Sequence, residues 1–112
     1  MAVEEAIKTM NNQEIIPYIV NKIKTQFNPK KIIQFGSLVW GKPGEDSDID
    51  LFIIMDSELR RDERARKVQK LFSDRKFPLD IIVYTPLEIE DSIKRGNPFI
   101  KEILSKGSVV YG

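Results

Sequence analysis

Residues 35–54 read FGSLVWGKPGEDSDIDLFII, and this stretch contains the pattern that decides the predicted fold. An apolar run ends at Gly36-Ser37, where a glycine favours a turn. Residues 41–46 are rich in glycine, proline and charge, which is typical of a loop. Residues 48–54 are dominated by β-branched and apolar residues and predict a buried strand. The stretch therefore predicts a strand, a turn, a loop and a second strand.

Outside this stretch, apolar spacing and the positions of glycine and proline predict alternating helices and strands. The charged run 60–67 is expected to be the solvated face of a helix. The expected elements are helices over 3–8, 16–27 (with Pro17 near its start), 58–73, 86–93 and 98–104, and strands over 31–35, 48–54, 79–84 and 108–111. The predicted fold class is α/β (α+β), with a short mixed sheet of about four strands flanked by helices.

The composition limits the number of domains and the chemistry. A chain of 112 residues with 41% hydrophobic residues predicts one domain over 1–112, with enough apolar material for a core. The sequence has no cysteine and no histidine. This excludes thiol nucleophiles, Cys/His zinc sites and imidazole bases, so the chemistry has to use other side chains.

The charge pattern limits partners and location. Eighteen basic and seventeen acidic side chains give a net charge of +1, which disfavours extended nucleic acid as a partner. No apolar run reaches the roughly 20 residues needed to cross a bilayer. The acidic start of the sequence lacks the basic and then apolar pattern of a signal peptide. A cytoplasmic location is expected.

Acidic residues on two predicted strands indicate a metal site. Side chains alternate along a strand, so Asp48 and Asp50 point to the same side, about 6.5 to 7 Å apart. Their mutual repulsion is relieved by a divalent cation, and their hard oxygen ligands favour Mg²⁺, with Mn²⁺ as the alternative. Asp80 begins another apolar strand, and its carboxylate can reach the pair if the two strands are neighbours.

The turn that precedes these acids could hold a phosphate. Gly36-Ser37 ends a strand and opens a helical turn, where free backbone N–H groups and a hydroxyl can bind an anion. Ser37 could equally serve as an N-cap, which does not conflict with phosphate binding. Acids next to such a turn suit phosphoryl or nucleotidyl transfer, in which two metal ions stabilise the attacking and leaving oxygens.

One pattern in this sequence resembles the signature of the nucleotidyltransferase superfamily typified by DNA polymerase beta. It consists of Gly36-Ser37, ten further residues, Asp48-Ile49-Asp50 and a later Asp80. The short chain resembles its minimal nucleotidyltransferase branch. This resemblance implies that Asp48 and Asp50 bind the two Mg²⁺ ions that hold the triphosphate of ATP or another nucleotide. Asp80 would complete one metal site and help to ionise the acceptor hydroxyl. Gly36 and Ser37 would hold the terminal phosphates.

The sequence departs from the family pattern at Trp40, where relatives often carry a basic residue before the following glycine. Lys42 could replace the missing cation and bind the triphosphate. The Trp40 side chain could either anchor the core or stack on a base.

Two other motifs fit this region less well. Residues 36–42 have the glycines and lysine of a Walker A loop, but Pro43 stands where a Ser or Thr must coordinate Mg²⁺. The acids of residues 46–50 resemble an EF-hand loop, but Leu51 replaces its glycine and Ser57 its glutamate.

The resemblance also implies a partner. Minimal nucleotidyltransferases are commonly paired with a small helical toxin that carries a HEPN domain, and they act as its antitoxin, in some systems by transferring AMP to a toxin tyrosine. The alternatives are a non-catalytic module that neutralises a partner by contact, and transfer to a small molecule. A homo-oligomer remains open.

Overall fold

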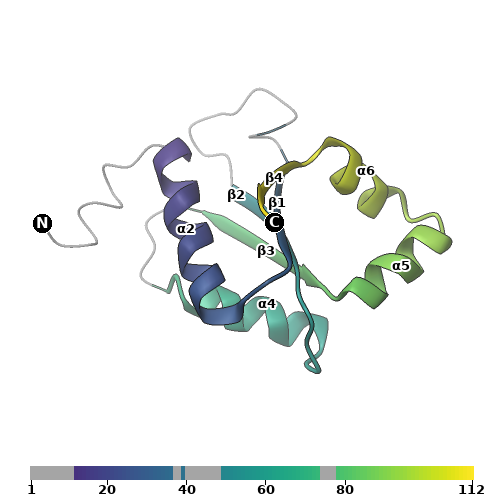
Figure 1. Cartoon of the computed structure of the whole chain (residues 1–112), viewed down its shortest axis with the longest axis horizontal. Helices are drawn as coiled ribbons and strands as arrows, with labels where there is room; N and C mark the ends of the chain where they lie inside the picture. The colour runs from purple at the N-terminus through teal and green to yellow at the C-terminus, as the bar shows by residue number, and fades with distance from the viewer. Residues whose placement is uncertain (1–11, 37–38, 40–48, 74–77) are drawn as a thin grey trace, which may run out of the picture.

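The computed structural model describes residues 12–36, 39, 49–73 and 78–112 (Figure 1). Its elements are the helices α2 (Asn12–Phe27), α4 (Arg61–Lys70), α5 (Pro86–Lys94) and α6 (Pro98–Lys106), and the strands β1 (Lys31–Phe35), β2 (Ile49–Ile54), β3 (Leu79–Tyr84) and β4 (Ser108–Tyr111). None of the helices in this described part of the chain is both long and apolar enough to cross a membrane.

The strands form one sheet in the order β3-β2-β1-β4. β1 is antiparallel to both β2 and β4, whereas β2 and β3 are parallel and are joined through α4. The mixed, four-stranded sheet confirms the predicted α+β fold class.

Helices cover both faces of this sheet, with α2 and α4 on one side and α5 and α6 on the other (Figure 1). On the first face, Leu51 and Ile53 of β2 are in the same apolar cluster as Ile19 of α2. On the second face, Phe52 of β2 clusters with Ile100 of α6. Because both faces are covered, the central strands consist almost entirely of apolar residues.

The observed elements differ from the expected ones mainly at their ends. Helix α2 begins at Asn12, so Pro17 lies inside the helix and not near its start. Pro17 has no N–H group, so the helix forgoes one backbone hydrogen bond there. Helix α4 is shorter than the expected 58–73 and spans Arg61–Lys70. The expected helix over 3–8 lies outside the described residues.

Candidate active site

The parallel pairing of β2 and β3 brings Asp50 and Asp80 side by side. The two residues are direct partners in the register of these strands. Their Cα atoms are therefore about 4.8 Å apart, and both side chains point to the same face of the sheet. Asp80 is exposed and Asp50 is half-buried, so the pair opens toward solvent at the edge of the sheet where both strands begin.

Gly36 lies directly against this pair. Asp50 is also the antiparallel partner of Phe35, which is the last residue of β1. Gly36, the residue after Phe35, therefore lies beside Asp50. Gly36 has φ of 85°, a conformation that favours glycine. A Cβ atom at this position would overlap with the Asp50 carboxylate. Only glycine therefore lets the Asp50 carboxylate lie against the backbone of the turn.

A hydrogen bond closes this turn on itself. The backbone N–H of Val39 donates to the carbonyl oxygen of Gly36 at 2.9 Å. This bond joins the end of β1, beside Asp50, to Val39. The phosphate-binding role of this turn stays a prediction, because Ser37 lies outside the described residues.

Three of the predicted site residues can be placed, and the structure brings them together: Gly36, Asp50 and Asp80. The other three, Ser37, Lys42 and Asp48, lie outside the described residues, as does Trp40. Their predicted roles remain predictions.

The residues that can be placed suit a divalent metal ion. Asp50 and Asp80 present hard carboxylate oxygens from neighbouring rigid strands to one side of the sheet. Like charges directly opposite each other destabilise a sheet, and a bound cation offsets that repulsion. Within the ranges that the structure describes, no group of three or more metal-binding side chains occurs, so the described part offers these two carboxylates as possible ligands.

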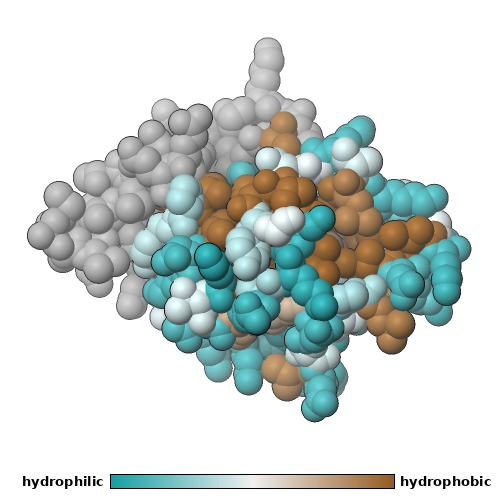
Figure 2. Space-filling view, in the orientation of Figure 1, coloured by the Kyte–Doolittle hydropathy of each residue, from teal (hydrophilic) through white to brown (hydrophobic). Residues whose placement is uncertain are grey.

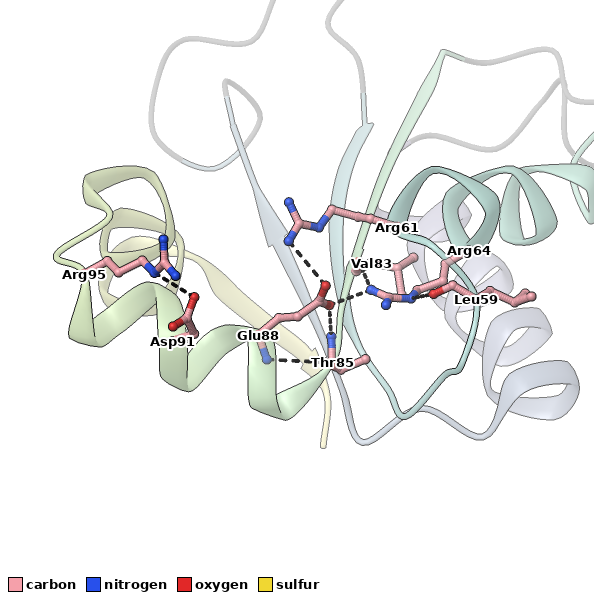
Figure 3. Close-up of polar contacts among 8 residues, drawn as sticks. All are labelled: Leu59, Arg61, Arg64, Val83, Thr85, Glu88, Asp91 and Arg95. Carbon is pink, nitrogen blue, oxygen red and sulfur yellow. Dashed lines mark hydrogen bonds and ion pairs between the residues drawn. The ribbon is translucent and has the colours of Figure 1, made fainter.

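The opposite end of the same strands carries a network of charged side chains (Figure 3). Glu88 of α5 accepts an ion-paired hydrogen bond at Oε1 from Arg64 of α4 at 2.5 Å, and Oε2 pairs with Arg61 at 3.3 Å. The Arg64 side chain also donates from Nε to the Leu59 carbonyl oxygen at 2.8 Å. This network links α4 and α5 across the end of β3.

The helix α5 begins with a capping box that uses the same glutamate. The Thr85 hydroxyl accepts from the Glu88 N–H at 3.2 Å, and the Thr85 N–H donates to Glu88 Oε1 at 2.8 Å. Burial by itself raises the pKa of the Glu88 carboxyl. The Thr85 hydrogen bond and the charges of Arg64 and Arg61 outweigh it and lower the pKa to about 2. Glu88 is therefore ionised at neutral pH, and it connects the start of α5 to α4.

The expectation of a solvated face over residues 60–67 was wrong for one member. Arg64 is 7% exposed, because its guanidinium lies between α4 and the end of β3. Arg61 is half-exposed, and its guanidinium lies 4.0 Å from the centre of the Tyr84 ring. The sequence held one signal for this network, the Thr-x-x-Glu spacing of a capping box at Thr85 and Glu88.

Comparison with known families agrees with this geometry. The family model described as the nucleotidyltransferase domain matches residues 16–111. The match begins in α2 and ends in β4, so it includes the whole sheet and the acid pair. The chain belongs to the nucleotidyltransferase domain family, whose members act on nucleoside triphosphates with divalent metal ions. No curated protein matches the chain.

Proposed function

We propose that this protein transfers AMP from ATP to a hydroxyl group of a partner protein. The observation that carries the proposal is the register pairing of Asp50 with Asp80, with Gly36 against the Asp50 carboxylate, in a chain of the nucleotidyltransferase family.

The reaction joins the acceptor oxygen to the α-phosphorus of the nucleotide. The bond between the α-phosphorus and the bridging oxygen breaks, and pyrophosphate leaves with that oxygen. The acceptor hydroxyl gives its proton to the carboxylate of Asp80, which is exposed and can be reached by a second molecule. Gly36 and Ser37 hold the terminal phosphates at the turn, and Lys42 adds a positive charge.

Asp48, Asp50 and Asp80 would hold Mg²⁺, which when bound neutralises the phosphate oxygens and the charge that develops on the leaving group. Asp50 presents its oxygens from a strand with covered faces, so the protein fixes their position before the nucleotide binds. The half-buried position of Asp50 supports a ligand role, and the exposure of Asp80 supports a role next to the acceptor.

We further propose that the acceptor is a tyrosine of a small helical HEPN-type toxin, and that the transfer makes this protein its antitoxin. The support is the resemblance of the Gly36-Ser37 and Asp-x-Asp pattern to minimal nucleotidyltransferases, which are commonly paired with such toxins. An Arg, four residues and a His in the product of an adjacent gene would identify the candidate.

The test mixes purified protein with that candidate partner, Mg²⁺ and each of the four nucleotides labelled at the α-phosphate. We expect label on the partner with ATP, and none when EDTA replaces Mg²⁺. Asp50→Asn and Asp80→Asn should each lose the transfer. Asp56→Asn is the matched control, because Asp56 is an exposed carboxylate just beyond the other end of β2, paired with Lys30.

Two results would overturn the proposal. One is a partner that stays unlabelled with all four nucleotides. The other is full transfer by the Asp50→Asn or Asp80→Asn variant. If these variants neutralise the partner without labelling it, the protein acts by contact and not by catalysis.

A further inference from the structure

A row of side chains crosses the sheet at the acid pair. Phe35 of β1 is the register partner of Asp50, and Asp50 is the partner of Asp80. Directly paired residues point to the same face, with Cβ atoms about 5 Å apart. Phe35 therefore borders the acid pair on the side away from β3.

The ring of Phe99, from α6, packs on Phe35. The two ring centres are 5.9 Å apart and the rings are nearly perpendicular, at 84°. In this arrangement the edge of one ring meets the face of the other. Whichever ring supplies the edge, at least one face of the Phe99 ring is left uncovered by Phe35.

Part of the Phe99 side chain is open to solvent. Phe35 is 6% exposed, whereas Phe99 is 42% exposed. Figure 2 shows apolar side chains gathered over β4, α6 and α5 on one face of the molecule. The exposed large apolar residues of the described chain all lie on these elements: Leu87, Ile93, Phe99, Leu104 and Val109. Within this set, Phe99 is the aromatic member, and its ring packs on a direct neighbour of Asp50.

The backbone that carries Phe99 is held by the cap of α6. Asn97 caps α6, and its Oδ1 accepts from the N–H groups of Phe99 at 3.0 Å and Ile100 at 3.3 Å. Pro98 fixes the first helical residue. Ile100 and Ile103 are fully buried on the sheet. The backbone at Phe99 therefore needs no ordering when a ligand covers the ring.

We infer that the exposed face of Phe99 is where the nucleobase of the bound nucleotide stacks. This inference rests on the proposed function, because the acids and the turn fix the triphosphate end of the same ligand. The apolar Phe99 ring lies next to the acids and the turn, and it suits the planar base at the other end of the nucleotide. Every base has a π-face, so stacking here adds affinity without choosing among bases.

The test compares two ligands that differ in the base. ATP and inorganic tripolyphosphate are each titrated with Mg²⁺ into the wild-type chain and into Phe99→Ala. We expect the variant to bind ATP about fivefold to tenfold more weakly and to bind tripolyphosphate as tightly as the wild type. GTP should lose about as much as ATP.

Further variants separate stacking from folding. Phe99→Tyr keeps the ring and should bind ATP normally, whereas Phe99→Leu keeps apolar bulk and should lose most of the effect. Leu104→Ala, on the same helix, is the control and should leave both affinities unchanged.

Three outcomes overturn the inference: unchanged ATP affinity in Phe99→Ala, equal losses for ATP and tripolyphosphate, or normal ATP binding by Phe99→Leu. Failure of the wild-type chain to bind ATP would instead overturn the proposed function.

Discussion

The carboxylates at the two ends of the parallel pair β2–β3 differ in their surroundings. At the end where the strands begin, Asp80 is exposed beside Asp50, and no ion pair to Asp80 occurs among the described residues. Beyond the end of β3, Glu88 is held by Arg64, Arg61 and the Thr85 N–H. A carboxylate that is neutralised by the protein itself serves the fold. Asp50 and Asp80, set side by side, are two like charges that a cation from solution can bridge.

This difference separates stability from activity within one sheet. Changes at Glu88 or Arg64 should alter the free energy of unfolding. Changes at Asp50 or Asp80 should alter metal binding and transfer while the fold persists.

The largest expected effect is on transfer by Asp50→Asn. Losing a metal-binding carboxylate removes several kcal/mol of transition-state stabilisation, so the rate should fall about 1,000-fold or more. Thermal unfolding without metal should stay within a few degrees of the wild type. Labelled-nucleotide transfer and calorimetry on the same preparation check both statements. A variant that unfolds instead would place Asp50 with the structural carboxylates.

The next largest effect is a loss of stability in the variant Arg64→Met. Arg64 is buried and pairs with Glu88, so its removal leaves a partly buried carboxylate without its main cation. We expect a loss of about 2 to 3 kcal/mol in the free energy of unfolding, measured with urea.

Arg66→Met is the matched control, because the Arg66 side chain is 65% exposed and, among the described residues, pairs only with the exposed Asp62 on its own helix. That substitution should cost at most about 0.5 kcal/mol. Equal losses in the two variants would contradict the structural role given to Arg64.

A smaller effect is the contribution of Glu88 to the dependence of stability on pH. The pKa of Glu88 is lowered from 4.5 to about 2 in the folded chain, so its ionised form stabilises the fold. That contribution is complete above about pH 4.5 and is lost as the pH falls toward 2. The partial exposure of Glu88 reduces it to about 1 to 2 kcal/mol.

The measurement is urea unfolding of wild type and Glu88→Gln between pH 6 and pH 2.5. The variant should be less stable at pH 6, and its stability should fall less with acid than that of the wild type. Parallel losses of stability in the two proteins would show that Glu88 is not the group involved.

The smallest expected effect is a gain in stability. Asp80→Asn removes the like charge beside Asp50, so without metal this variant should be about 0.5 kcal/mol more stable than the wild type. Added Mg²⁺ should stabilise the wild type by ligand linkage and leave the variant unchanged. An Asp80→Asn variant that is less stable without metal would contradict the account of repulsion.

Much of the fold could be predicted because the sequence is locally consistent. The apolar runs at 31–35, 79–84 and 108–111 are strands with the expected bounds. The condition under which Asp80 can reach the other acids, that the strands 48–54 and 79–84 are neighbours, is met, because β2 pairs with β3 and Asp50 with Asp80. The spacing of Gly36-Ser37 and the acids indicated the family, but the pairing of the two strands is seen only in the structure.

Contacts between distant elements could not be predicted. Arg64 lies within a charged run, and only the packing of α4 against β3 shows that it is buried. The place of Phe99 beside Phe35 depends on how α6 crosses the sheet, which no local pattern indicates. Helix ends also shifted, as for α2, because tertiary packing outweighs the cost of Pro17.

The most direct test of the acid pair is a titration with Mn²⁺, followed by the electron paramagnetic resonance signal of the free ion. We predict that the wild type and Asp56→Asn bind the ion equally, and that Asp50→Asn and Asp80→Asn each bind it at least about 100-fold more weakly. Binding by Asp80→Asn that equals the wild type would contradict the claim that the two neighbouring strands together hold the metal.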